Sequence, residues 1–214
     1  AIGWWMVASG LVNRTEVSQY RLATHLTIAC IIFAATLWVA RGLVPRPEAG
    51  RAGRIARRLG LAIVVLALCQ IYLGGLVAGL RAGLIYNTWP LMDGSLIPAG
   101  LLSIEPVWRN FFESHLTVQF VHRCGAYLLL AATLFHAVML WRAAPGTRHA
   151  RGAAILFCVV VAQAAIGIAT LLMVVPIDLA LMHQAGGLIV LATAVIHARG
   201  LNGGYSAAVV ERPA

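Results

Sequence analysis

The sequence has no lysine, only seven acidic residues and few charged residues of any kind. Charged residues make up 11% of the chain, whereas a soluble domain carries about a quarter. Hydrophobic residues make up 61%, and the mean hydropathy is +0.86. This shortage of charge excludes an ordinary soluble domain and predicts a protein surrounded by membrane lipid. The net charge of +9 does not indicate nucleic-acid binding, because the arginines fall between apolar segments.

Cysteine is also scarce. Cys30, Cys69, Cys124 and Cys158 each lie in a different apolar segment, and no two of them form a CxxC pair. This pattern excludes a disulfide framework and a thiolate metal site. It predicts that all four are small core residues.

Five segments are long and apolar enough to cross a bilayer, which takes about 20 residues. They are residues 20–41, 59–80, 114–141, 152–175 and 178–198. A sixth apolar stretch, Ile2 to Val12, covers only about half a bilayer at about 1.5 Å per residue. The chain is therefore expected to be an all-α, polytopic transmembrane helical bundle with five full spans and a partial first one.

The connections differ in charge. Most arginines lie in the connections near residues 41–58 and 142–151 and after residue 198. The remaining connections hold most of the acidic residues: Glu16, Asp93, Glu105, Glu113 and Asp178. The positive-inside rule predicts that the arginine-rich side and the C-terminus are cytoplasmic.

Three histidines, His25, His122 and His183, each lie a few residues inside a span on the acidic side. Histidine inside a membrane is costly and marks a ligand, a proton relay or a polar cavity. Small residues follow His122 and His183 on the same helix face: Gly125 and Ala126, then Gly186 and Gly187. This pattern leaves room for a flat macrocycle between two axial imidazoles. The alternative is histidine that is hydrogen-bonded between helices.

The segment from Gly3 to His25 resembles the segment from Gly167 to His183. Each consists of an outgoing helix end, a turn and an ingoing helix with histidine in its first turns, and the two histidines are 158 residues apart. If His183 pairs with His122, a partner for His25 would lie the same distance before His122, upstream of Ala1. We therefore expect a truncated copy that lacks two further helices.

Other residues allow more than one interpretation. Arg123 could hold a haem propionate or extend to the membrane surface. His136 and His197 lie fourteen residues after His122 and His183, which is the spacing of a dihaem b-type cytochrome. Four amides in apolar segments, Gln70, Gln119, Gln163 and Gln184, predict interhelical hydrogen bonds. The Gly75, Gly79 and Gly83 series predicts close helix packing, and residues 81–94 predict a cap over the outer end of the bundle.

Several motifs resemble the haem A synthase family in its alphaproteobacterial and mitochondrial branch. The match runs in order from about Gly3 to about Leu191. It is carried by GWWMVASGL from Gly3, VSQYRLATHL from Val17, GLRAG from Gly79, YNTWPLMDG from Tyr86, NFFE from Asn110, QFVHR from Gln119 and His183-Gln184.

The resemblance implies an eight-helix inner-membrane enzyme built from two four-helix halves. Such enzymes oxidise a methyl group of haem O to the formyl of haem A by two successive hydroxylations and loss of water. Haem b would be held by His122 and His183, and the substrate haem by His25. The implied partners are membrane lipid, a haem O synthase and cytochrome oxidase assembly factors.

The missing start puts the activity of this chain in doubt. The family's first two helices, its second substrate-side histidine and its carboxylate-bearing first outer loop are absent. No catalytic acid is therefore assigned, and the chain is expected to bind haem b without converting haem O. The oligomeric state is open, a homo-oligomer included.

The expected division of the chain follows the two halves. Residues 1–58 are the remnant of the substrate-haem half, 59–112 are the third span with its outer loop, 113–198 are the haem b-binding helices and 199–214 are a cytoplasmic tail.

Two alternative functions remain. One is a b-type cytochrome that only carries electrons, and the other is a small-substrate transporter whose histidines relay protons, disfavoured by the absence of broken mid-span helices.

Overall fold

The computed structural model describes residues 3–4, 17–44 and 52–203. Five long helices dominate these residues: α2 (Gln19–Leu43), α3 (Arg54–Gly79), α5 (His115–Ala143), α6 (Arg148–Leu172) and α7 (Ile177–Leu201). Each is long and apolar enough to cross a membrane. The predicted fold class, an all-α polytopic bundle with five full spans, is confirmed. Most of the predicted partial span from Ile2 to Val12 lies outside the described residues.

Two helices begin earlier than the apolar pattern predicts. α3 starts at Arg54 and α6 at Arg148, because arginine and alanine favour helix although they end an apolar run. The Thr147 hydroxyl caps α6 by accepting a hydrogen bond from the Ala150 amide at 3.3 Å. α6 also ends earlier than predicted, and Val174 and Val175 follow it with positive φ angles of 62° and 56°. β-Branched residues rarely adopt that backbone conformation, so the turn into α7 is sharp.

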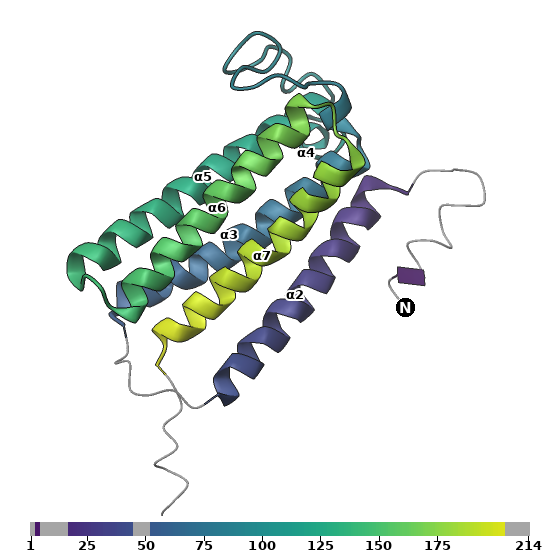
Figure 1. Cartoon of the computed structure of the whole chain (residues 1–214). Helices are drawn as coiled ribbons and strands as arrows, with labels where there is room; N and C mark the ends of the chain where they lie inside the picture. Colours follow the sequence, from purple (N-terminus) through teal and green to yellow (C-terminus); the bar gives the residue numbers. More distant parts are fainter. Residues whose placement is uncertain (1–2, 5–16, 45–51, 204–214) are drawn as a thin grey trace, which may run out of the picture.

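Four of the helices form a bundle. Around it, α3 contacts α5, α5 contacts α6, α6 contacts α7 and α7 contacts α3, as Figure 1 shows. α5 and α7 have almost no close backbone approach within the described residues, so they stand diagonally across the bundle, and α3 and α6 form the other diagonal. α2 packs outside this bundle, against α3 and α7.

Small and branched apolar side chains fill the middle of the molecule. The largest buried cluster comes from α2, α3, α5, α6 and α7: Cys30, Ala34, Ile63, Ala67, Leu129, Leu156, Val160, Val190, Leu191, Ala194 and Val195. Cys30 is a core residue, as predicted. Cys69, Cys124 and Cys158 are exposed on the helix surfaces, so the prediction was wrong for these three. A thiol is apolar enough to face lipid as well as a core.

The glycines of α3 bring it into close contact with α2. A Cβ on Gly75 would lie 2.8 Å from the Cα of Ala23, and one on Gly79 would lie 2.6 Å from the Cα of Gln19. Gly83 faces Val175, whose Cγ2 would be 2.9 Å from its Cβ. The predicted close helix packing is therefore confirmed for Gly75 and Gly79, whereas Gly83 lies beyond the end of α3.

Gly79→Ala should destabilise the packing of α2 on α3. The new methyl group meets backbone, which cannot rotate away, and overpacking of this kind costs about 1–3 kcal/mol. Thermal unfolding in detergent measures the loss. Gly53→Ala is the matched control, because no atom lies within 4 Å of the added Cβ. Equal melting temperatures for the two variants would contradict this account of the contact.

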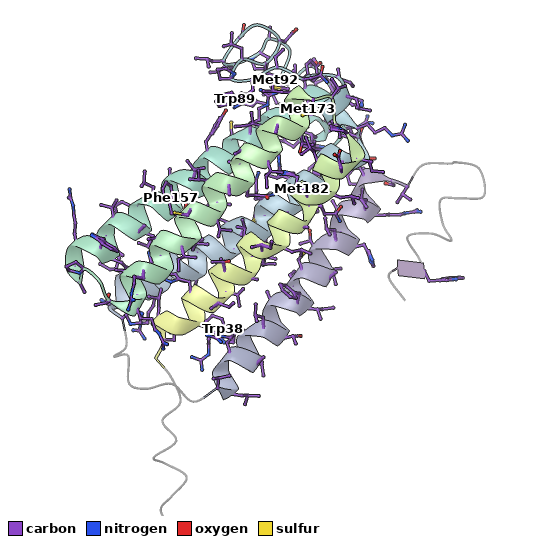
Figure 2. All side chains as sticks on the ribbon, in the orientation of Figure 1. Trp38, Trp89, Met92, Phe157, Met173 and Met182 are labelled. Atoms are coloured by element: carbon purple, nitrogen blue, oxygen red, sulfur yellow. The ribbon has the colours of Figure 1, made fainter. Side chains whose placement is uncertain are left out.

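The two ends of the bundle differ. At one end, arginines lie at the helix termini: Arg41, Arg54, Arg57, Arg58, Arg142, Arg148, Arg151 and Arg199. The opposite end, here called the loop end, carries the connection from α3 to α5, which contains the short helices η1 (Ala82–Leu84), η2 (Val107–Arg109) and α4 (Asn110–Glu113). Figure 2 shows Trp89 and Met92 at the loop end and Trp38 near the arginine-rich end. Which end is cytoplasmic stays a prediction.

Candidate functional site

His122 lies in the second turn of α5, near the loop end, and its side chain is half-buried. Gln70 of α3 reaches it from the neighbouring helix. The Gln70 amide nitrogen is 3.1 Å from Nδ1 and 3.5 Å from Nε2 of His122, and it donates to the backbone carbonyl of His122 at 3.0 Å. One amide therefore contacts both the ring and the backbone of the histidine.

His183 of α7 has the same arrangement. The Gln163 amide nitrogen, from α6, is 3.1 Å from His183 Nδ1 and donates to the His183 carbonyl at 2.7 Å. The two histidines come from one diagonal of the bundle and the two glutamines from the other. The sequence analysis predicted interhelical bonds for both glutamines, which is confirmed, but it did not identify the histidines as their partners.

Glycines lie against both imidazole rings. A Cβ on Gly74, one turn after Gln70, would lie 3.3 Å from His122 Cε1. A Cβ on Gly167, one turn after Gln163, would lie 2.6 Å from His183 Cε1. Each ring therefore rests on a helix backbone that has no side chain at that point.

The glycines that follow the histidines make room for the glutamines. A Cβ on Gly125 would meet Oε1 of Gln70, and one on Gly186 would meet Oε1 of Gln163. The space predicted there for a macrocycle is thus occupied by an amide group at these two positions. Both amide oxygens are buried and have no hydrogen-bond partner.

His122 and His183 belong to α5 and α7, the two helices that stand diagonally across the bundle. Each presents an imidazole nitrogen, a ligand that suits haem iron. The glycine beside each ring gives the imidazole room, and the unpartnered amide oxygen beside each histidine is an outer hydrogen-bonding group of the kind that such a site needs. The residues present therefore fit a haem between α5 and α7.

His25 lies apart from this pair. It is half-buried on α2, outside the four-helix bundle, and the Cβ of an alanine at Gly3 would lie 3.3 Å from its Cε1. Within the described residues, no hydrogen bond joins it to His122 or His183. The Gly3 contact has the same form as the contact of Gly167 with His183, which agrees with the predicted repeat. A role toward a substrate haem stays a prediction.

A second histidine pair, His136 of α5 and His197 of α7, joins the same two helices near the arginine-rich end. Their Nε2 atoms are 2.9 Å apart, and the ring centroids are 5.1 Å apart in an edge-on arrangement. Both side chains are buried. Because the rings touch each other, this geometry leaves no room for a macrocycle between them.

Comparison with known proteins identifies relatives of this chain. Residues 1–195 match the COX15-CtaA family, described as "Cytochrome oxidase assembly protein". The chain belongs to this family. It is 63% identical over 205 residues to "Heme A synthase" of Mesorhizobium japonicum, covering 96% of this chain and 56% of that protein. It is also 61% identical over 206 residues to "Heme A synthase" of Chelativorans sp., covering 96% and 56%.

A third relative gives the same result. The chain is 57% identical over 213 residues to "Heme A synthase" of Rhizobium etli, covering 99% of this chain and 58% of that protein. The chain thus spans about half the length of the curated relatives it matches.

In this member of the COX15-CtaA family, Arg123 holds the loop of residues 86–91. Its guanidinium donates to the carbonyls of Tyr86, Thr88 and Leu91, at 2.9 to 3.3 Å, and to Gln119 Oε1 at 3.1 Å. Its Nε is buried without a partner. A propionate contact stays a prediction, and the loop contacts are the role that sequence reasoning missed.

Arg123 is the centre of a polar stripe on α5. Gln119, one turn before it, donates to the Ala82 carbonyl at 3.2 Å. Tyr127, one turn after it, accepts from Trp89 Nε1 at 3.1 Å. Residues four apart share a helix face, so the stripe ties the α3–α5 connection to α5 beside His122. The predicted cap over the outer end is tied down along this stripe.

Asn110 organises the end of this connection. Its side chain is fully buried. It accepts from the Ile104 amide at 3.0 Å and donates to the carbonyls of Ile104 at 2.7 Å and Val107 at 2.9 Å. The Asn110 side chain thus forms hydrogen bonds with three backbone groups of the irregular connection, the N–H and C=O of Ile104 and the C=O of Val107.

Glu113 links the same region to α2. Its carboxylate accepts from the Tyr20 hydroxyl at 2.9 Å and forms an ion pair with Arg109 at 2.5 Å. The Tyr20 and Phe112 rings are stacked, with centroids 5.9 Å apart. Sequence reasoning could not distinguish Glu113 from other loop carboxylates, because its partner Tyr20 lies far away in the chain.

These contacts predict the titration of Glu113. The hydrogen bond from Arg109 lowers the pKa of this carboxyl, and the one from Tyr20 lowers it further. Because the folded-state pKa is depressed, the ionised carboxylate stabilises the fold at neutral pH. That contribution is lost as the pH falls through the depressed pKa, below the ordinary value of about 4.3. Carbon-13 NMR of the carboxyl should therefore show a midpoint below that value. Arg109→Gln should raise it, and an unchanged midpoint would contradict the assignment.

Proposed function

We propose that this chain binds haem b between His122 and His183 and contributes this site to the synthesis of haem A from haem O, which the chain is not expected to carry out alone. The observation that carries the proposal is the matched pair of histidines on diagonal helices, each with a glutamine at its Nδ1 and a glycine against its ring. Relatives named "Heme A synthase" at 57–63% identity support the reaction.

Haem b in this position would supply one-electron transfer during oxidation of the haem O methyl group to a formyl group. The protein residues do the remaining work. His122 and His183 bind and orient the ring between α5 and α7. Arg123 keeps the α3–α5 connection against α5 beside His122. His25, on α2, would bind the substrate haem outside the four-helix bundle.

The location follows from the same proposal. A protein with five membrane-spanning helices meets its substrate, a lipid-soluble haem, within the bilayer. The arginines at one end of the bundle favour the bacterial inner membrane with that end and the C-terminus in the cytoplasm. Haem O synthase and cytochrome oxidase assembly factors are the proposed partners.

A haem titration of the purified chain tests the binding site. With haem b, we expect one haem per chain in the pyridine haemochrome assay and a low-spin, six-coordinate spectrum. His115→Ala is the control, because this exposed side chain lies at the start of α5, outside the proposed site. A chain without low-spin haem would contradict the proposal.

The same titration also tests the alternative function, a b-type cytochrome that only carries electrons. Two haems per chain would favour a dihaem electron carrier that uses His136 and His197. The direct contact between these two histidines favours one haem per chain.

The conversion of haem O to haem A is tested in the full-length Mesorhizobium japonicum relative, in cells that make haem O. Replacing the histidines that align with His25, His122 or His183 should stop haem A accumulation, measured by chromatography of extracted haems. Unchanged haem A would contradict the assigned roles.

A further inference from the structure

Gln70 and Gln163 hold the two proposed haem ligands in the same unusual way. Each amide lies at Nδ1 of a histidine on the neighbouring helix and directs its nitrogen to that histidine's own carbonyl. Each leaves its oxygen buried without a partner. An unpartnered buried oxygen is costly, and the same feature occurs twice in one bundle. This recurrence indicates a function beyond helix packing.

The hydrogen bonds determine which ring nitrogen carries the proton. In neutral imidazole, one nitrogen donates and the other accepts. The carbonyl of His122 can only accept, so the group of Gln70 that faces it is the NH₂. The same NH₂ lies 3.1 Å from Nδ1 and 3.5 Å from Nε2 of His122, so Nδ1 is the nearer acceptor and the contact favours a proton on Nε2. The carbonyl contact of Gln163 leads to the same tautomer for His183.

Iron ligation through Nε2 requires the other tautomer. The Nε2 lone pair must be free, so the proton moves to Nδ1, which becomes a donor and needs an acceptor. The unpartnered oxygen of the adjacent glutamine is an acceptor within the same amide group. The histidine carbonyls lose little when that amide turns, because each is a helix carbonyl that also accepts within its own helix.

We propose that Gln70 and Gln163 are positioning residues that select the tautomer of His122 and His183, donating to Nδ1 in the haem-free chain and accepting from Nδ1 when haem is bound. This inference rests on the proposed haem site. The glycines explain why the amides can change partners. Gly125 and Gly186 provide the space for the amide oxygen, and Gly74 and Gly167 allow the ring to move against a bare helix.

The haem-bound state has a measurable consequence. An acceptor at Nδ1–H increases electron donation from the imidazole and stabilises ferric over ferrous iron. Removing the acceptor should therefore raise the midpoint potential, and a stronger acceptor should lower it. A residue that only packs helices together would change stability without this opposite response.

The first experiment uses the haem-bound chain. Gln70→Met and Gln163→Met keep side-chain size but remove the acceptor, while Gln70→Glu and Gln163→Glu strengthen it. We expect higher midpoint potentials for the Met variants, lower ones for the Glu variants and matching shifts of the low-spin ferric EPR signals. Gln184→Met is the control, since this side chain neighbours His183 but is exposed. Met and Glu variants that behave like the control would overturn the proposal.

The second experiment needs no haem. Nitrogen-15 NMR of labelled histidines in the haem-free chain should show protonated Nε2 at His122 and His183. Gln70→Met should remove this preference at His122 alone, and Gln163→Met at His183 alone. Unchanged tautomers would overturn the haem-free part of the proposal. A wild-type chain that binds no haem would refute the proposed function instead, and the NMR result would then decide the role of the glutamines by itself.

Discussion

Replacing His183 with alanine should abolish low-spin haem b binding. Loss of an outer hydrogen-bonding partner alone typically lowers metal affinity about 10–100-fold, and loss of the ligand itself should exceed that. The change also removes the ring partner of the Gln163 amide nitrogen. The Gln163 side chain, whose oxygen already has no hydrogen-bond partner, would then lose a contact at its nitrogen as well. His122→Ala should have the same effect, because the two histidines would act as one pair. Optical titration with haem b measures the affinity, and the absorption spectrum reports the spin state.

The comparison with other histidines makes this result specific. His115→Ala changes an exposed histidine on α5 and should retain the low-spin spectrum. His136→Leu should lower stability, because it leaves His197 without its 2.9 Å partner, which costs about 1–3 kcal/mol for a buried group. It should nevertheless leave one haem per chain. A low-spin haem that survived both His122→Ala and His183→Ala would refute the site.

The spans were predictable because composition determines them. A bilayer imposes its thickness on every spanning helix, so the apolar runs located all five helices. Their ends were less predictable, since Arg54 and Arg148 continue helices that the apolar pattern ends. The arrangement of the helices was not predictable from those runs. Which helices stand diagonally depends on which faces pack, and apolar side chains surround each of these helices.

The candidate site was partly predictable. Histidine in a span is rare enough to attract attention, and in the structure His122 and His183 each contact a glutamine of a neighbouring helix. The sequence repeats one pattern at the residues that contact these histidines: a glutamine is followed four residues later by a glycine, at Gln70 and again at Gln163. The pattern could not identify what the amides bind, because that depends on the rotation of a neighbouring helix.

Long-range polar contacts were the least predictable features. Tyr20 and Glu113 are 93 residues apart in the chain, and Arg123 contacts carbonyls 32 to 37 residues before it. Neither spacing has a periodicity that a sequence could reveal. The stripe of Gln119, Arg123 and Tyr127 is regular only on α5, and its partners lie in an irregular connection.

The glycines beside the rings predict a graded series of effects. The nearest atom to an added Cβ is 2.6 Å away for Gly167, 3.3 Å for Gly74 and 3.7 Å for Gly187. At Gly167 and Gly74 this atom belongs to a histidine ring, which can move aside without disturbing the helices. Gly167→Ala should therefore displace His183 and weaken haem b binding by about 10–100-fold, the loss typical of a disturbed ligand shell.

Gly74→Ala should weaken binding less, and Gly187→Ala should change it little, because 3.7 Å is an ordinary contact. Circular dichroism and thermal unfolding, measured alongside the haem titration, separate a displaced ligand from a damaged fold. The helical content should remain equal in all three variants. Equal haem affinities for Gly167→Ala and Gly187→Ala would mean that His183 does not bind iron in the position where Gly167 supports it. A ligand that depends on the absence of a single methyl group would explain why glycine stands against each of these imidazoles.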